Sequence, residues 1–218
     1  MNKFLSIVLM MCLPVLGQAA GGAAVELTPA PINVDDKVSL QRGAQIFVNN
    51  CLGCHSAQYM RYERMATDLE IPTEILTKNM LFTTERAGDT MVAAMPKDLS
   101  KVWFGTIPPD LTLVARIRGA DWVYSYLIGF YPDDKRPWKV NNHVFPDVGM
   151  PHVLSNMERR LGEKGFKEAM ADLTNYMVYM AEPVRAERER LGVWVLLFLA
   201  IFFIPVYFLN REYWKDVH

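Results

Sequence analysis

The sequence has few cysteines, no excess of charge of either sign and no internal repeats. Its 218 residues contain three cysteines, at positions 12, 51 and 54, which is too few for a second disulfide bond. The 23 basic and 24 acidic side chains leave a net charge of −1, which argues against nucleic acid as a partner. Since no repeat or low-complexity tract divides the chain, the roughly 170 residues between its two ends are expected to form one domain.

The N-terminus has the pattern of an export signal. Lys3 precedes an apolar run over residues 4–16, and small residues follow it. The run is shorter than the roughly 20 apolar residues that cross a bilayer. Residues 1–19 are therefore predicted to be a signal peptide, which removes Cys12 on cleavage. Lipid attachment to Cys12 is disfavoured because Met11 is bulky where that reaction needs a small residue.

One long apolar run lies near the C-terminus. Residues 191–209 carry no charge, and as a helix they would extend about 28 Å, close to the thickness of the hydrocarbon core of a bilayer. Trp194, Tyr207 and Trp214 fit the aromatic residues found at membrane interfaces. The run therefore predicts a transmembrane helix. The predicted organisation is a signal peptide (1–19), an exported domain (20–184), a juxtamembrane and transmembrane helix (185–210) and a short cytoplasmic tail (211–218).

The two remaining cysteines belong to a Cys-Leu-Gly-Cys-His motif at residues 51–55. Two thiols at this spacing can add to the two vinyl groups of a porphyrin, and the adjacent imidazole can then bind its iron. The motif occurs once. It predicts a single haem c attached through Cys51 and Cys54, with His55 as the proximal iron ligand.

Three other interpretations of this cysteine pair are weaker. A zinc site would need more ligands at close spacing, but His143 and His152 are distant and nine residues apart. A thioredoxin-like pair would need a strand–helix–strand setting, which the surrounding sequence lacks. A structural disulfide would leave the adjacent histidine unexplained.

Helical periodicity occurs before the motif and late in the chain. Residues 38–50 put apolar side chains on one face of a helix, with Ser39 as a candidate N-cap. A second helix is predicted over residues 163–181. A shorter one is predicted near Pro72, and residues 183–190 are predicted to continue as helix into the membrane.

The second axial ligand of the iron is not decided by sequence spacing. A methionine there favours electron transfer, whereas an open position permits gas binding or peroxidase chemistry. The chain contains 13 methionines, and most of them must be packing residues. Met95 and Met150 each precede a proline, and His152 is a third candidate, so the residues alone leave three alternatives.

Longer stretches resemble the cytochrome c1 family, the haem subunits of cytochrome bc1 complexes. Residues 51–62, with the motif and Tyr59, Arg61 and Tyr62, are similar to the haem-attachment region of that family. Residues 103–111 resemble its haem-packing loop, and the Phe-Pro-Asp-Val-Gly-Met-Pro stretch at 145–151 resembles its axial-methionine loop. The resemblance spans most of the domain and includes the C-terminal anchor.

The resemblance implies specific roles for five residues. His55 would be the proximal and Met150 the distal iron ligand. The carbonyl of Pro109 would accept the ring N–H of His55 and so fix the orientation of the imidazole. Arg118 would lie near a haem propionate, with Arg116 as the alternative.

The resemblance also implies a fold and a function. The fold would be mainly α, with a class I cytochrome c-like haem domain and one C-terminal transmembrane helix. In class I cytochromes c, a glycine at the position of Gly43 lets the C-terminal helix approach closely. The chain would be the subunit of a quinol–cytochrome c oxidoreductase that relays electrons from a Rieske iron–sulfur protein to a cytochrome c, next to cytochrome b. Its haem domain would lie in the periplasm, anchored to a bacterial inner membrane.

Other functions remain possible on sequence grounds. A free-standing membrane-anchored cytochrome c would show the same patterns. A haem peroxidase would be expected to carry a second Cys-x-x-Cys-His motif, and a gas or redox sensor would be expected to have a cytoplasmic output domain. The chain has one such motif and nine residues after Leu209, which disfavours both.

Overall fold

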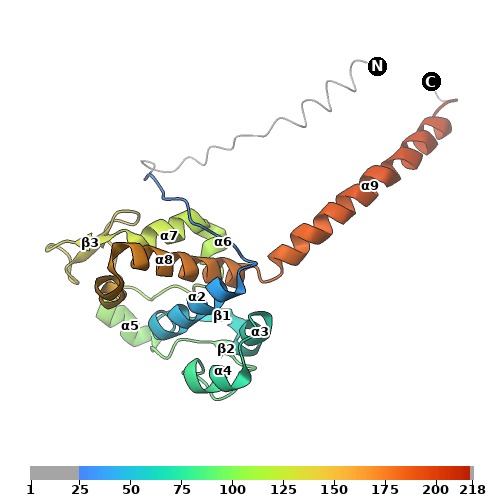
Figure 1. The fold of residues 1–218 in the computed structure, drawn as a ribbon. Helices are drawn as coiled ribbons and strands as arrows, with labels where there is room; N and C mark the ends of the chain where they lie inside the picture. The colour runs from blue at the N-terminus through green and yellow to red at the C-terminus, as the bar shows by residue number, and fades with distance from the viewer. Residues whose placement is uncertain (1–24, 217–218) are drawn as a thin grey trace.

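A mainly helical domain continues into one projecting helix, as the computed structural model in Figure 1 shows. The structure describes residues 25–216, so the expected signal peptide lies outside the described residues. The predicted fold class, mainly α with one long apolar C-terminal helix, is confirmed. The elements are α2 (Lys37–Asn50), β1 (Ala57–Arg61), α3 (Tyr62–Asp68), α4 (Thr73–Asn79), β2 (Thr90–Met91), α5 (Lys97–Phe104), α6 (Val114–Arg118), α7 (Ala120–Ile128), β3 (Phe130–Pro132), β4 (Val140–Asn142), α8 (Ser155–Ala181) and α9 (Arg185–Tyr213).

Helix α2 begins one residue before the predicted start. Its cap is Asp36, whose carboxylate accepts a hydrogen bond from the backbone N–H of Ser39 at 3.0 Å. The prediction of Ser39 as the cap is wrong, because Ser39 lies inside the first turn. Its hydroxyl instead accepts a hydrogen bond from Asn175 of α8 at 3.0 Å. The side chain of Ser39 therefore links α2 to α8.

The centre of the domain is the contact between α2 and α8 (Figure 1). Leu40, Ala44 and Phe47 are buried on the face of α2 that the periodicity predicted. Helix α8 is interrupted at Gly162, whose φ of +66° is not helical. The long straight part of α8 therefore starts at Glu163, where the sequence predicted a helix to begin.

The two helices touch at Gly43. A Cβ atom added there would lie 2.6 Å from Cβ of Tyr176 and closer still to the carbonyl oxygen of Asp172. Real atoms do not approach so closely, and neither of these neighbours is the free end of a flexible side chain. Only glycine is therefore compatible with the observed distance between α2 and α8.

We expect Gly43→Ala to destabilise the domain by about 3 kcal/mol or more, because the two helices must move apart and lose packing. The free energy of unfolding, from denaturant titration of the purified protein, measures this change. Gly88→Ala is a matched control, since the nearest atom to its added Cβ is the end of the Glu63 side chain at 3.8 Å. Equal stability of the two variants would contradict the prediction.

Two short antiparallel sheets of two strands each accompany the helices, β1 with β2 and β3 with β4. The sequence did not predict them, because strands of two to five residues are too short to show a reliable alternation. The stretch from residue 70 to 101 contains α4, β2 and the first residues of α5. Helix α4 follows Pro72 directly, which agrees with the helix predicted there.

Helix α9 contains the whole apolar run of residues 191–209. Among the described residues it is the one helix long and apolar enough to cross a membrane, and none of its residues is buried within the chain. Arg185 pairs with Glu189 at 2.8 Å one turn later, as the predicted helical register requires. Its exposed apolar surface suits contact with lipid or with another membrane helix.

Candidate functional site

The Cys-x-x-Cys-His motif forms the turn that ends α2. The N–H of Cys51 donates to the carbonyl of Phe47 at 2.8 Å, which closes the last helical turn. The N–H groups of Cys54 and His55 both donate to the carbonyl of Cys51, at 3.1 and 2.8 Å. This tight turn brings two thiols and an imidazole to the wall of one cleft.

Burial is the main electrostatic influence on these three groups. It raises the pKa of Cys51 to about 12, with a smaller contribution from Cys54, and it also raises the pKa of Cys54. Burial lowers the pKa of His55, and the carbonyl of Pro109 and the carboxylate of Asp110 oppose that shift. Both thiols are therefore protonated near neutral pH, and the imidazole is neutral, the form that binds a metal.

Met150 lines the same cleft as His55. His55 Nδ1 lies 2.8 Å from the carbonyl oxygen of Pro109, to which it donates. Within residues 25–216, Nε2 of this ring makes no hydrogen bond, so it is the nitrogen left for a metal. The lining is almost entirely apolar, and besides the motif it includes Phe104, Pro108, Pro109, Gly149, Met150 and Val153.

This set of donors fits a covalently held haem. Two thiols at the correct spacing, an imidazole with one nitrogen already engaged, and a thioether in the same cleft are the groups that such a cofactor uses. Apolar walls suit the porphyrin face. The described lining contains no carboxylate that would favour a hard metal ion instead.

The loop that contains Pro108 and Pro109 is bonded through Asp110 to the segment that follows the motif. Its carboxylate accepts hydrogen bonds from the backbone N–H of Gln58 at 2.9 Å and from the hydroxyl of Thr112 at 2.6 Å. The N–H of Leu111 also donates to the carbonyl of Ser56 at 2.8 Å. These bonds hold the carbonyl of Pro109 against His55, a role for Asp110 that the sequence did not indicate.

Asn142 holds the start of the loop that leads to Met150. Its side-chain oxygen accepts hydrogen bonds from the N–H groups of Val144 and Phe145, at 2.9 and 3.1 Å. Its side-chain nitrogen donates to the carbonyl of Tyr126 on α7 at 2.7 Å. One buried amide thus joins the loop to a helix.

Asn141 and Arg136 hold the later part of the loop that leads to Met150. The side-chain oxygen of Asn141 accepts a hydrogen bond from the N–H of Asp147 at 2.9 Å. Arg136 donates to the carbonyls of Asp147 and Val148, at 2.6 and 3.2 Å. Sequence reasoning missed Asn141, Asn142 and Arg136, because none of them lies in the stretches that resemble the cytochrome c1 family.

We expect Asn142→Ala to destabilise the domain by about 2 kcal/mol, since the N–H groups of Val144 and Phe145 lose their acceptor and the carbonyl of Tyr126 keeps only the N–H of Gly129. Denaturant unfolding measures the loss. Asn49→Ala serves as a control, because the exposed Asn49 makes one hydrogen bond within its own helix, to Gln45. A loss no greater than that of the control would show that the loop does not depend on Asn142.

Three residues, Met95, Met150 and His152, were candidates for the second axial ligand of the iron. Met150 is the one found in the described lining of the cleft. Met95 precedes α5 and is not part of that lining. His152 is engaged elsewhere, since its Nε2 lies 2.8 Å from a carboxylate oxygen of Glu158 and its ring stacks on Phe130 with the centroids 4.7 Å apart. The position of these side chains therefore favours Met150 over Met95 and His152, whereas their spacing in the sequence did not distinguish them.

The two arginine candidates have different surroundings. Arg118 is exposed at the end of α6, where its guanidinium lies 5.1 Å from the centre of the Trp122 ring, and it is not in the described cleft lining. Arg116 is paired with Glu182 at 2.5 Å, and Glu182 also pairs with Arg188 of α9 at 2.5 Å. Arg116 therefore serves to connect α6 with the anchor helix.

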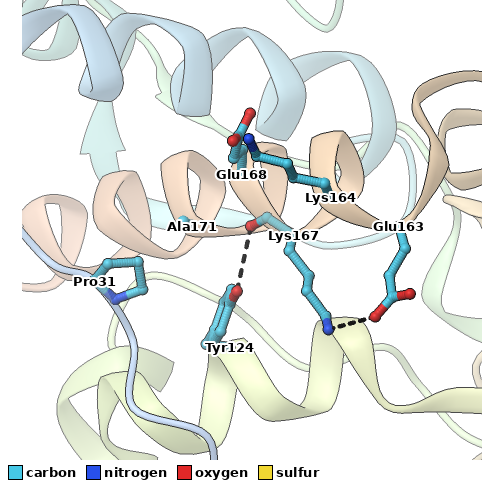
Figure 2. A pocket seen from close by; sticks show the side chains of 7 residues that line it. All are labelled: Pro31, Tyr124, Glu163, Lys164, Lys167, Glu168 and Ala171. Carbon is cyan, nitrogen blue, oxygen red and sulfur yellow. Dashed lines mark hydrogen bonds and ion pairs between the residues drawn. The ribbon is translucent and has the colours of Figure 1, made fainter.

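A second hollow lies between α7 and α8 (Figure 2). Here the hydroxyl of Tyr124 donates to the carbonyl of Lys167 at 3.4 Å, and the ammonium of Lys167 pairs with Glu163 at 2.7 Å. The described lining of this hollow contains no thiol, imidazole or thioether. The cleft at the motif is therefore the better candidate site.

Comparison with known proteins identifies the family. The model of the Cytochrome C1 family matches residues 29–217. The chain belongs to the cytochrome c1 family. It is 44% identical to the cytochrome c1 of Allochromatium vinosum over the full length of both chains. It is 27% identical to the cytochrome c1 of Rhodospirillum rubrum over 84% of this chain and 83% of that one.

Another relative of this cytochrome c1-family chain carries a different name. The chain is 39% identical to a Nitrosomonas europaea protein named ammonia monooxygenase gamma subunit, over all of this chain and 99% of that one. The family membership confirms the predicted resemblance. This cytochrome c1-family member is accordingly an electron carrier with a C-terminal membrane helix, and its family implies covalent haem c, for which the Cys51 and Cys54 pair is present.

Proposed function

We propose that this chain is the haem-bearing subunit of a quinol–cytochrome c oxidoreductase. It would work with cytochrome b and a Rieske iron–sulfur subunit and would deliver electrons to a cytochrome c. The observation that carries the proposal is the family match over residues 29–217, in a chain whose motif and Met150 line one cleft. When bound, the haem supplies reversible one-electron chemistry.

The residues of the chain hold and orient this haem. Cys51 and Cys54 would hold it through two thioether bonds, and His55 and Met150 would be its iron ligands. Pro109 fixes the imidazole through the hydrogen bond at Nδ1, and a ligand held in advance needs little rearrangement when the charge on the iron changes. Arg118, exposed at the end of α6, would offset the charge of a propionate.

The proposed location is a bacterial inner membrane. Residues 1–19 act as a cleaved signal peptide, 20–184 form the periplasmic domain, 185–210 anchor it and 211–218 form the cytoplasmic tail. The support is the apolar helix α9, which has no buried residue within the chain and so offers its whole surface to the bilayer and to cytochrome b.

One comparison favours a second candidate function. The Nitrosomonas europaea relative is named a gamma subunit of ammonia monooxygenase, and it matches this chain over its whole length. On that alternative, the chain would be a cytochrome subunit associated with such a monooxygenase. A free-standing anchored cytochrome is the third possibility, and it would use the same cleft without a partner subunit.

Affinity purification from native membranes in mild detergent tests the proposal. We expect cytochrome b and a Rieske protein to co-purify, and added quinol to reduce the haem of the purified material. Replacing residues 191–209 with an unrelated transmembrane helix is the control, since it keeps the anchor and should lose cytochrome b. Co-purification with monooxygenase subunits would favour the second candidate, and purification alone would favour the third.

A further inference from the structure

Tyr126 of α7 reaches the proposed distal ligand. Its hydroxyl oxygen lies 3.4 Å from the sulfur of Met150, within hydrogen-bonding distance for the larger sulfur atom. A thioether has no proton to give, so the hydroxyl is the donor.

The ring of Tyr126 is held from several sides. It stacks on Trp122 with the centroids 5.3 Å apart and the planes 9° from parallel. Phe130 meets it edge-on, also at 5.3 Å. Asn142 holds its backbone carbonyl at 2.7 Å, and the same side chain fixes the loop of Met150. The hydroxyl and the sulfur are thus positioned by one shared framework.

From this geometry we infer that Tyr126 is a positioning residue for Met150, whose hydroxyl holds the thioether and reduces its donation of electrons to ferric iron. The inference rests on the proposed role of Met150 as the distal ligand. A thioether sulfur has two lone pairs, so one can bind the metal while the other accepts the hydrogen bond. Withdrawing density from the sulfur disfavours the ferric state more than the ferrous state, and therefore raises the reduction potential.

The same helix offers a matched control. Tyr124 lies two residues earlier, about 200° away around the helix axis, so it faces the opposite side of α7. Its hydroxyl donates to the carbonyl of Lys167 at 3.4 Å in the second hollow (Figure 2). Tyr124→Phe and Tyr126→Phe each remove one tyrosine hydroxyl from α7 and keep the ring, but only the second removes the contact with Met150.

The test is an optical redox titration of the full chain with its haem attached, in detergent. At a fixed ambient potential, Tyr126→Phe is expected to lower the ratio of ferrous to ferric protein roughly threefold, or about 28 mV for one electron. The ferric protein should also bind added imidazole more weakly, because the sulfur now holds the iron more tightly. Tyr124→Phe should leave both the ratio and the imidazole affinity at their wild-type values.

The outcomes separate this inference from the proposed function. Wild-type protein without a sulfur-to-iron absorption band would overturn both the assignment of Met150 and the role of Tyr126. A wild-type band with an unchanged potential in Tyr126→Phe would overturn the role of Tyr126 alone. An equal fall of the reduction potential in Tyr124→Phe would also overturn the role of Tyr126, since it would reveal a general effect of losing a hydroxyl on α7.

Discussion

Replacing Cys51 and Cys54 together with alanine is expected to abolish covalent haem attachment completely. The two thiols lie on one wall of the cleft and are the cysteines left after the predicted signal peptide is removed. Without them no thioether can form. Haem staining of a denaturing gel measures the result, because only covalently held haem migrates with the chain.

Cys12→Ala is the control for this experiment. It removes the third cysteine, which lies in the predicted signal peptide, and should leave haem staining at the wild-type level. Each single variant, Cys51→Ala or Cys54→Ala, should retain at most one thioether bond. A stained band in the double variant would contradict the proposed attachment.

Met150→Leu is expected to convert a closed haem into one that binds external ligands. Leucine is similar to methionine in volume, so the cleft should keep its packing while losing the sulfur. The sulfur-to-iron absorption band should disappear, and the ferrous protein should change from negligible to stoichiometric binding of carbon monoxide. The reduction potential should also fall, because a methionine ligand raises it.

Met95→Leu is the matched control, because it removes the other methionine that precedes a proline, outside the cleft lining. Its spectra should equal those of the wild type, with no binding of carbon monoxide. An unchanged spectrum in Met150→Leu would instead transfer the ligand role to Met95 or His152. For His152 to become the ligand, its ring would have to give up the contacts with Glu158 and Phe130.

Sequence reasoning predicted the elements that have long periodic patterns. Helix α2, the straight part of α8 and the apolar α9 each contain several turns of regular spacing, and all three are present. The cap of α2 was misassigned because Ser39 and Asp36 are both good capping residues, and local sequence does not say which one precedes the first turn. The two small sheets depend on pairing between separate segments, which local pattern does not reveal.

The site was predictable only where local chemistry or resemblance marked it. The motif at 51–55 identifies its own chemistry, and the family loops pointed to Pro109 and Met150, which line the cleft with it. Asn141 and Asn142 were missed because their bonds go to backbone groups of a later loop and of α7. Tyr126 was missed because its partner lies 24 residues away. Such contacts exist only once the chain has folded.

The amide bonds made by Asn141 and Asn142 have a consequence for the order of assembly. They hold the loop of Met150, which lines the same cleft as Cys51, a thiol that is 8% exposed. We therefore expect a rigid porphyrin to react with this buried thiol before the loop is in place, so that closure of the loop becomes the last step of maturation.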